Sequence, residues 1–281
     1  MTTLILGSNG FLGKEISSYV KQNNDKKESL ILDQSKFDRL SQLKELLQNS
    51  KPKVIINCIA MTDSKKCETS PKKAIQVNSE IPELISQYSS KHDSTFIHIS
   101  SDAVMDINSA FKCENELPKP FNVYGMSKLM GENAIVSSNC DYLICRVNFF
   151  GNSHKKNSLL DFFVTNIQSN TRCPGYTNVW FNPLGIQTLI DSIFKLFRSN
   201  ARGVFHVVGD SKISKYEFGK EVERLINPMS NFVYPTKILS SILEAKSMDL
   251  SLCNCKLKRY MKRLPSWQSD LESALIERVM T

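Results

Sequence analysis

The chain has 281 residues, of which 41% are hydrophobic and 23% charged, and its formal net charge is +8. This length suits one large α/β unit or two joined lobes, and the composition is that of an ordinary globular enzyme. No apolar run approaches the roughly 18 residues of a membrane span, and the N-terminus lacks the basic start of a signal peptide. We therefore expect a cytoplasmic protein with no membrane partner.

The positive charge is spread along the chain, and no nucleic-acid-binding motif accompanies it. We interpret it as solvated faces, with a field that draws an anionic small substrate, and we expect no nucleic-acid partner. The eight cysteines form no Cys-x-x-Cys pair, and the two that lie closest, Cys253 and Cys255, have no histidine nearby. This pattern predicts buried or inert thiols and no metal site.

Short apolar runs alternate with amphipathic stretches over the first 150 residues. Ser70 is a suitable N-cap for the third of the predicted helices, and Pro71 suits its first turn. The predicted strands are residues 4–6, 29–32, 53–58, 95–100 and 141–147, and the predicted helices are residues 13–22, 40–47 and 72–91. Strand–helix–strand repetition indicates right-handed crossovers, and hence an α/β fold with a Rossmann-type, doubly wound parallel sheet.

The pattern changes after residue 150. A loop is predicted over residues 170–183, and the chain ends in a short helix. The other predicted elements are helices at residues 159–169, 185–198 and 216–226 and a strand at 204–208. We predict a dinucleotide-binding domain over residues 1–150, to which residues 184–210 return, and a smaller C-terminal substrate lobe made by most of residues 151–281.

Three glycines, Gly7, Gly10 and Gly13, directly follow the first predicted strand and open the first predicted helix. Their GxxGxxG spacing suits a tight turn, the close approach of a pyrophosphate and the packing of a helix on a strand. The N–H groups at the start of that helix would then meet the phosphates, together with the positive end of its dipole. The pattern predicts a site for NAD(P)H.

An acidic residue, Asp33, ends the second predicted strand about twenty residues past the glycines, where an acid commonly binds the ribose hydroxyls. Its charge would repel a 2′-phosphate, which favours NADH slightly over NADPH, although Lys36 nearby offsets this. Asp38 is a further candidate for the adenine end. The alternative for Asp33 is an ordinary turn or capping residue.

Tyr124 and Lys128 form a YxxxK pattern between the fourth and fifth predicted strands. On a helix the two side chains share a face, and a cation beside the phenol should lower its pKa. Ser101 and Asp102 follow the fourth strand at the sheet edge where ligands bind, and a hydroxyl there stabilises a developing alkoxide. We predict Ser101, Tyr124 and Lys128 to be catalytic, whereas His98 is interpreted as a packed core residue.

These features together resemble the extended short-chain dehydrogenase/reductase superfamily, and within it the dTDP-4-dehydrorhamnose reductase family. The similarity spans nearly the whole chain, and the block around Tyr124 is the most specific part of it. The matching segments are residues 7–13, 57–62, 98–106, 120–132 and 264–268.

The resemblance implies roles for further residues. Phe11 and Leu12 would meet the pyrophosphate through their backbone N–H groups, with Asn9 in the same turn, and Asp102 would contact the sugar. The cofactor would also be lined by Ile59, Ala60 and Met61. The chain departs from the family at Ala103, where a tyrosine is usual, and at Asn148 and Phe149, where Ser-Trp is usual. These departures lie on the substrate side and leave the sugar and the base open.

The resemblance implies an NAD(P)H-dependent oxidoreductase, a reductase of a nucleotide-activated 4-keto-6-deoxy sugar in deoxysugar and surface-polysaccharide biosynthesis. One alternative is a nucleotide-sugar epimerase or dehydratase, but a dehydratase carries Glu where this chain has Ala103. Another is a non-catalytic subunit like the regulatory subunit of methionine adenosyltransferase, although such a relative should have lost part of its catalytic set. The expected partner is the nucleotide-sugar substrate, and the sequence allows a homodimer without fixing the oligomeric state.

Overall fold

The structure is a computed structural model that describes residues 2–23, 29–32, 40–238 and 247–280. Contacts within the chain gather into two units. The first comprises Met1–Val104, Leu117–Val147 and Ile193–Phe205, and the second comprises Met105–Glu116, Asn148–Ser192 and His206–Thr281. The domain boundary expected near residue 150 stays a prediction.

The first unit is built on a six-stranded sheet with the order β10-β5-β4-β3-β1-β2. Its strands are β1 (Thr3–Leu6), β2 (Ser29–Leu32), β3 (Val54–Asn57), β4 (Thr95–Ser101), β5 (Asp141–Val147) and β10 (Gly203–Val207). The pairs β1–β2, β1–β3, β3–β4 and β4–β5 are all parallel. The predicted parallel, doubly wound sheet is therefore confirmed. The strand order reverses between β1 and β3, and such a reversal creates a crevice at the carboxyl ends of the strands.

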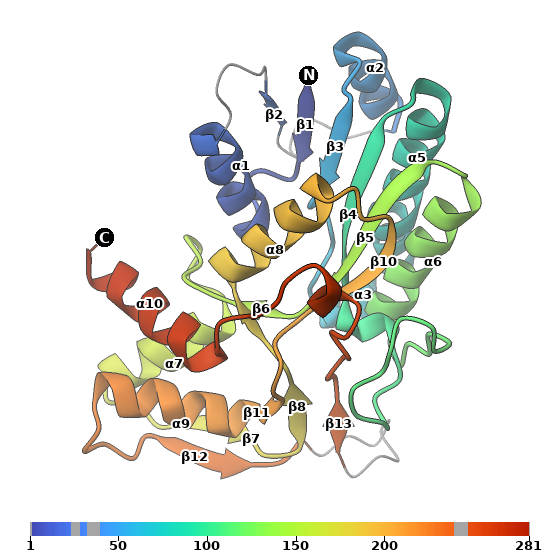
Figure 1. Ribbon diagram of the computed structural model, residues 1–281. Coiled ribbons are helices and arrows are strands. Elements are labelled where there is room, and N and C mark those ends of the chain that lie inside the picture. The colour runs from blue at the N-terminus through green and yellow to red at the C-terminus, as the bar shows by residue number, and fades with distance from the viewer. Residues whose placement is uncertain (1, 24–28, 33–39, 239–246, 281) are drawn as a thin grey trace. The chain divides into compact units, whose positions relative to one another are not determined.

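Helices cover both faces of this sheet. Figure 1 shows α2, α5 and α6 on one face and α1 on the other. The end of α8 packs on α1, where Phe194 stacks on Tyr19 with ring centroids 4.6 Å apart. The bounds are α1 (Phe11–Asn23), α2 (Leu40–Ser50), α3 (Ser64–Thr69), α4 (Pro71–Ile75), the π-helix η2 (Gln76–Glu80), α5 (Ile81–His92), the 3-10 turn η3 (Asp102–Val104), α6 (Val123–Ser137) and α8 (Ile186–Arg198).

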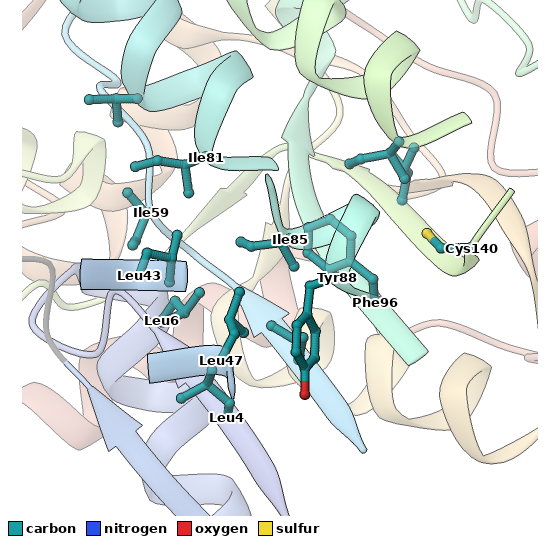
Figure 2. Close-up of a cluster of buried hydrophobic side chains, with 14 residues drawn as sticks. Leu4, Leu6, Leu43, Leu47, Ile59, Ile81, Ile85, Tyr88, Phe96 and Cys140 are labelled. Carbon is teal, nitrogen blue, oxygen red and sulfur yellow. The ribbon is translucent and has the colours of Figure 1, made fainter. Parts of the chain in front are cut away.

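Aliphatic side chains of the strands and of α2 and α5 form the core on one face of the sheet (Figure 2). Leu4, Leu6 and Ile55 from β1 and β3 are completely buried, as is Phe96 from β4. Burial on both faces explains why these strands read as nearly continuous apolar runs, a pattern typical of parallel sheets. The core fixes the strands whose carboxyl ends carry the candidate site.

The helix predicted over residues 72–91 is interrupted by the π-helix η2. Pro82, at the start of α5, has no N–H for the carbonyl four residues earlier, and its ring would clash with that carbonyl in an α-helix. The extra residue of a π turn removes this conflict. The turn lies against α6, where a Cβ on Gly131 would be only 2.3 Å from the carbonyl oxygen of Asn78.

The second unit combines short strands with helices. Its sheets have the orders β11-β8-β13, β12-β7 and β6-β9. Its elements include β6 (Phe149–Phe150), α7 (Leu159–Gln168), β7 (Cys173–Tyr176), β8 (Val179–Phe181), β9 (Leu184–Gly185), β11 (Ile213–Ser214), α9 (Lys215–Ile226), β12 (Val233–Thr236), β13 (Met248–Asp249), the 3-10 turn η4 (Leu257–Arg259) and α10 (Trp267–Met280). Aromatic side chains gather in its core around Phe218.

Two expectations for this unit were wrong. The stretch predicted as a loop contains β7 and β8, which pair with strands far along the chain, Val233 lying beside Cys173 and Ile213 beside Phe181. Such partners leave no local signal in the sequence. The final helix is not short, since α10 has 14 residues and buries Trp267 and Leu271.

All eight cysteines are free thiols. Among the residues that the structure describes, none of the His, Cys, Asp and Glu side chains form a group of three or more that could hold a metal ion. In the same residues, every helix is too short or too polar to cross a membrane.

The contact between α6 and η2 predicts a stability change. Gly131→Ala would place a methyl group against a backbone carbonyl that cannot move aside cheaply, so the free energy of unfolding should fall by about 1–3 kcal/mol. Denaturant unfolding followed by circular dichroism measures this. Asn133→Ala, on the exposed side of the same helix, is the control and should be neutral or slightly stabilising. An unchanged Gly131→Ala protein would contradict the close packing.

Candidate active site

The glycine turn has the geometry that the spacing predicts. Gly7 adopts a φ of +85°, and the carbonyl oxygen of Gly7 accepts the Gly10 N–H at 3.0 Å. A Cβ on Gly13 would lie 2.1 Å from that oxygen, and one on Gly7 would lie 2.9 Å from the backbone of Cys58. Gly7 and Gly13 therefore leave no room for a side chain. At this point the backbones of β1, of α1 and of the loop after β3 lie in close contact.

The start of α1 is open to a ligand. Asn9 and Gly10 are exposed, Phe11 is half-buried and Leu12 is buried. No acidic side chain lies in the first turn of the helix, so nothing there opposes an anion at its positive end. This turn fits the pyrophosphate of a dinucleotide. The other predicted cofactor residues at this end, Asp33 and Asp38, lie outside the described residues.

The segment after β3 is fixed by two buried asparagines. Asn57 accepts the Ile59 N–H at 3.0 Å. Asn78, on η2, accepts the Met61 N–H at 2.8 Å and donates to the Met61 carbonyl at 3.1 Å. It also donates to the hydroxyl of Ser127 on α6 at 2.9 Å. The segment that carries the predicted cofactor residues Ile59, Ala60 and Met61 is thereby tied to the helix of Tyr124.

Asn78 was missed in the sequence. The signal that could have revealed it is an amide among the apolar residues of the predicted helix, next to Val77 and before Ile81. A buried polar side chain needs partners, and Asn78 is completely buried. The sequence does not show which partners it finds, because Met61 and Ser127 lie 17 and 49 residues away.

The structure places Ser101 at the end of β4 and Asp102 in the following turn η3. The Ser101 hydroxyl donates to a carboxylate oxygen of Asp102 at 2.8 Å and accepts the Ala103 N–H at 3.2 Å. Both side chains are nearly buried, with 8% of their surface exposed. The hydroxyl is thus held in place at the carboxyl edge of the sheet.

Helix α6 brings Tyr124 to this hydroxyl. Asn122 caps the helix by accepting the Gly125 N–H at 2.7 Å. Gly125 then packs on the turn after Ser101, since a Cβ there would lie 2.1 Å from the carbonyl oxygen of Ala103. This close approach makes the hydroxyls of Tyr124 and Ser101 hydrogen-bond neighbours. The structure therefore brings together the predicted residues Ser101, Asp102 and Tyr124.

The acidity of Tyr124 differs from the expectation. Burial raises its pKa to about 12, the hydrogen bond with Ser101 lowers it, and the negative charge of Asp102 raises it further. The expected lowering by Lys128 is absent because the amine points elsewhere. Its Nζ donates to the Ile99 carbonyl at 2.7 Å and lies 3.1 Å from His98 Nε2. Tyr124 is thus kept as a neutral phenol, which is a proton donor.

Lys128 is completely buried. Burial lowers its pKa to about 8, against the opposing charge of Glu132 one turn further along α6. Glu132 forms a buried ion pair with Arg146 on β5, with 2.7 Å between Nη2 and Oε2, and accepts the Ser100 hydroxyl at 2.5 Å. Two side chains on β4 and β5 therefore hold α6 beneath the candidate site.

Two predicted substrate residues, Asn148 and Phe149, belong to the second unit. The Asn148 carbonyl accepts the Leu184 N–H at 3.1 Å, and Phe149 pairs with Leu184 in the β6–β9 sheet. Their role at the substrate stays a prediction. The same unit has a cavity of about 520 Å³, lined by Gly209, Asp210, Ser211, Arg263, Leu264, Pro265, Ser266, Trp267 and Ser269.

The chain is similar to three curated relatives. It is 27% identical over 241 residues to the probable low-salt glycan biosynthesis reductase Agl14 of Haloferax volcanii, covering 80% of each chain. It is 26% identical to the dTDP-4-dehydrorhamnose reductase of Sinorhizobium fredii, over 96% of this chain and 95% of that one. It is also 26% identical to methionine adenosyltransferase 2 subunit beta of Xenopus laevis, over 83% of this chain and 74% of that one.

A solved structure shares the fold. The dTDP-4-dehydrorhamnose reductase of Bacillus anthracis, in complex with NADP, superposes with a TM-score of 0.86 over 98% of this chain and 99% of that one, at 23% identity. The family model described as the RmlD substrate binding domain matches residues 1–280. The chain therefore belongs to the RmlD substrate binding domain family, the dTDP-4-dehydrorhamnose reductase-like group that its sequence resembles.

Proposed function

We propose that the protein is an NAD(P)H-dependent reductase of a nucleotide-activated 4-keto-6-deoxy sugar, acting in deoxysugar and surface-polysaccharide biosynthesis. The observation that carries this proposal is the pairing of the Tyr124 phenol with the Ser101 hydroxyl at the sheet edge, in the unit that also holds the glycine turn. The similarity to two sugar-pathway reductases supports it.

The residues of the first unit fit a dinucleotide. The backbone at Gly7 and Gly13 leaves no room for a Cβ, and the exposed start of α1 carries no acid, as the approach of a pyrophosphate requires. A bound nicotinamide would supply the hydride. The choice of coenzyme depends on Asp33, whose carboxylate favours NADH, whereas the related Bacillus anthracis structure is a complex with NADP. Assays should therefore compare both.

The proposed chemistry needs a proton donor and a hydrogen-bond donor at the ketone oxygen. Tyr124 supplies the proton, and its raised pKa keeps it protonated at neutral pH. Ser101 turns its hydroxyl from Asp102 to the ketone oxygen and stabilises the developing alkoxide. Asp102 binds a sugar hydroxyl, and its charge adds to the burial that keeps the phenol neutral. Lys128 would hold the ribose next to the nicotinamide once its amine turns from the Ile99 carbonyl and His98.

Two other functions are weighed against the reductase. A dehydratase needs a second acid or base beside Asp102, and Ala103 cannot move a proton. A non-catalytic subunit of methionine adenosyltransferase needs no catalytic set, yet Ser101, Tyr124 and Lys128 are all present here. Function is read from the site and not from the fold, so the intact set favours an enzyme.

The glycine turn predicts where cofactor binding can be abolished. Gly10→Glu would place a side chain and a negative charge where the phosphates approach, and the Kd for NADH or NADPH should rise by more than about a hundredfold, or roughly 2.7 kcal/mol. Gly10 is exposed, so the fold should survive. Gly10→Ala is the control, with a smaller effect because its Cβ only touches the Gly7 carbonyl at 3.2 Å. Equal thermal shifts with cofactor for wild type and Gly10→Glu would refute the site.

Tyr124 is predicted to be the proton donor. Tyr124→Phe should lower kcat by about 10²–10⁴, the usual range for a lost acid–base group, while the Kd of the cofactor stays nearly unchanged. Tyr142→Phe, which removes a hydroxyl from β5, is the matched control and should keep full turnover. Near-full turnover of Tyr124→Phe would show that another group delivers the proton.

Stoichiometry tests whether the reaction is a net reduction. The purified protein is incubated with a nucleotide-activated 4-keto-6-deoxy sugar, and the absorbance of added NADH or NADPH is followed. One cofactor oxidised for each sugar consumed is the expected result. Product formed with no cofactor oxidised would instead identify an epimerase that recycles its own nicotinamide.

A further inference from the structure

Three completely buried polar side chains form a line through the first unit: Asn57 at the end of β3, His98 in the middle of β4, and Lys128 on α6. Asn57 Nδ2 lies 3.2 Å from His98 Nδ1, and His98 Nε2 lies 3.1 Å from Lys128 Nζ. The line begins at the backbone N–H of Ile59, which Asn57 Oδ1 accepts at 3.0 Å. Burial also lowers the pKa of His98 well below its usual value, so the ring is neutral at pH 7.

The backbone fixes the direction of every proton in this line. The Ile59 N–H can only donate, so the oxygen of the Asn57 amide faces it and the NH₂ group faces His98. His98 Nδ1 must then be the acceptor, and the ring proton lies on Nε2. This Nε2–H points at Lys128 Nζ, which can accept it only as a neutral amine.

A charged Lys128 cannot satisfy the same line. An ammonium needs an acceptor at His98 Nε2, which moves the ring proton to Nδ1 and sets it against the NH₂ group of Asn57. Rotating the Asn57 amide by 180° would remove that conflict. It would, however, place the NH₂ group of Asn57 against the Ile59 N–H, so that two donors face each other. Either arrangement buries a donor without an acceptor, which is unfavourable.

We propose that His98, oriented by Asn57, is a positioning residue that favours the neutral amine form of Lys128 in the cofactor-free protein and so makes Lys128 gain a proton less readily. The role given to Lys128 rests on the proposed function, in which its ammonium group would bind the ribose and act on the phenol of Tyr124. Deprotonation of Lys128 should then limit activity on the alkaline side.

Other groups around Lys128 act on its charge as well. Burial lowers its pKa to about 8, while the charge of Glu132 and, more weakly, the thiol of Cys58 after β3 raise it. Glu132 is itself paired with Arg146 from β5. On the β4 side, His98 is neutral and acts only through its hydrogen bond. Changing His98 therefore alters that hydrogen bond and leaves the charged neighbours in place.

The test titrates Lys128 directly, without cofactor or substrate. The full-length protein is labelled with ¹³Cε-lysine, and its NMR spectrum is followed from pH 6.5 to 10.5, with the signal of Lys128 assigned by its loss in Lys128→Arg. The wild-type midpoint is expected near 8, well below the value of about 10.4 for exposed lysines. His98→Gln presents an amide oxygen to the ammonium, and the midpoint should rise by about one pH unit, a tenfold gain in proton affinity.

Two further variants are measured so that the test does not depend on His98→Gln alone. His206→Gln makes the same change at the other completely buried histidine, which lies in the second unit, and should leave the Lys128 midpoint unchanged. Asn57→Asp keeps an acceptor for Ile59 and offers a second one to His98 Nδ1–H, so the midpoint should rise, and it should rise less when His98→Gln is also present.

The ring proton can also be located in the wild type. Above the Lys128 midpoint, ¹⁵N shifts of His98 should show the proton on Nε2, and a proton on Nδ1 would overturn the proposal. So would a Lys128 midpoint that His98→Gln leaves unchanged, or a wild-type midpoint at the ordinary lysine value. If these titrations behave as expected while no keto sugar is reduced, the proposed function fails and the positioning role of His98 stands.

Discussion

The candidate site depends on the close approach of α6 to the backbone around it. Glycine stands at two points where the helix backbone comes close to a carbonyl, Gly125 at Ala103 and Gly131 at Asn78. A larger residue at either point would push the helix outward and separate the Tyr124 phenol from Ser101. The buried pair of Glu132 and Arg146 then prevents the helix from turning about its own axis. The two glycines set the distance between α6 and the neighbouring backbone, and the ion pair sets the orientation of α6 about its axis.

The same packing produces the unusual acid–base properties of the site. A helix that lies this close to the sheet half-buries Tyr124 and completely buries Lys128, and the loss of water around each group disfavours its charged form. The phenol therefore becomes a weaker acid and the ammonium a stronger one. At neutral pH the phenol is therefore protonated, which is the form that the proposed reduction requires of it.

Much of the first unit could be predicted from the sequence because its signals are local. Continuous apolar runs predict buried parallel strands. The glycine turn and the spacing of Tyr124 and Lys128 are each patterns that span only a few consecutive residues. The roles of Asn78 and His98 could not be predicted in this way, because their partners come from other elements. His98 was rightly expected in the core, but its neighbour Lys128 lies 30 residues further on. The strands β7 and β8 were missed for the same reason.

The π-helix η2 also constrains the number of residues in the helical segment between Pro71 and His92. One additional residue in a helical turn rotates everything that follows by about 100° relative to a regular α-helix. This rotation lies between α4, which buries only Ala74, and α5, whose Ile81 and Ile85 pack in the core, at the turn that points Asn78 at Met61. Loss of a single residue here would turn either Asn78 or the core face of α5 toward solvent. Insertions and deletions between Pro71 and His92 should therefore be rarer among functional descendants of this gene than substitutions, even though the segment is helical throughout.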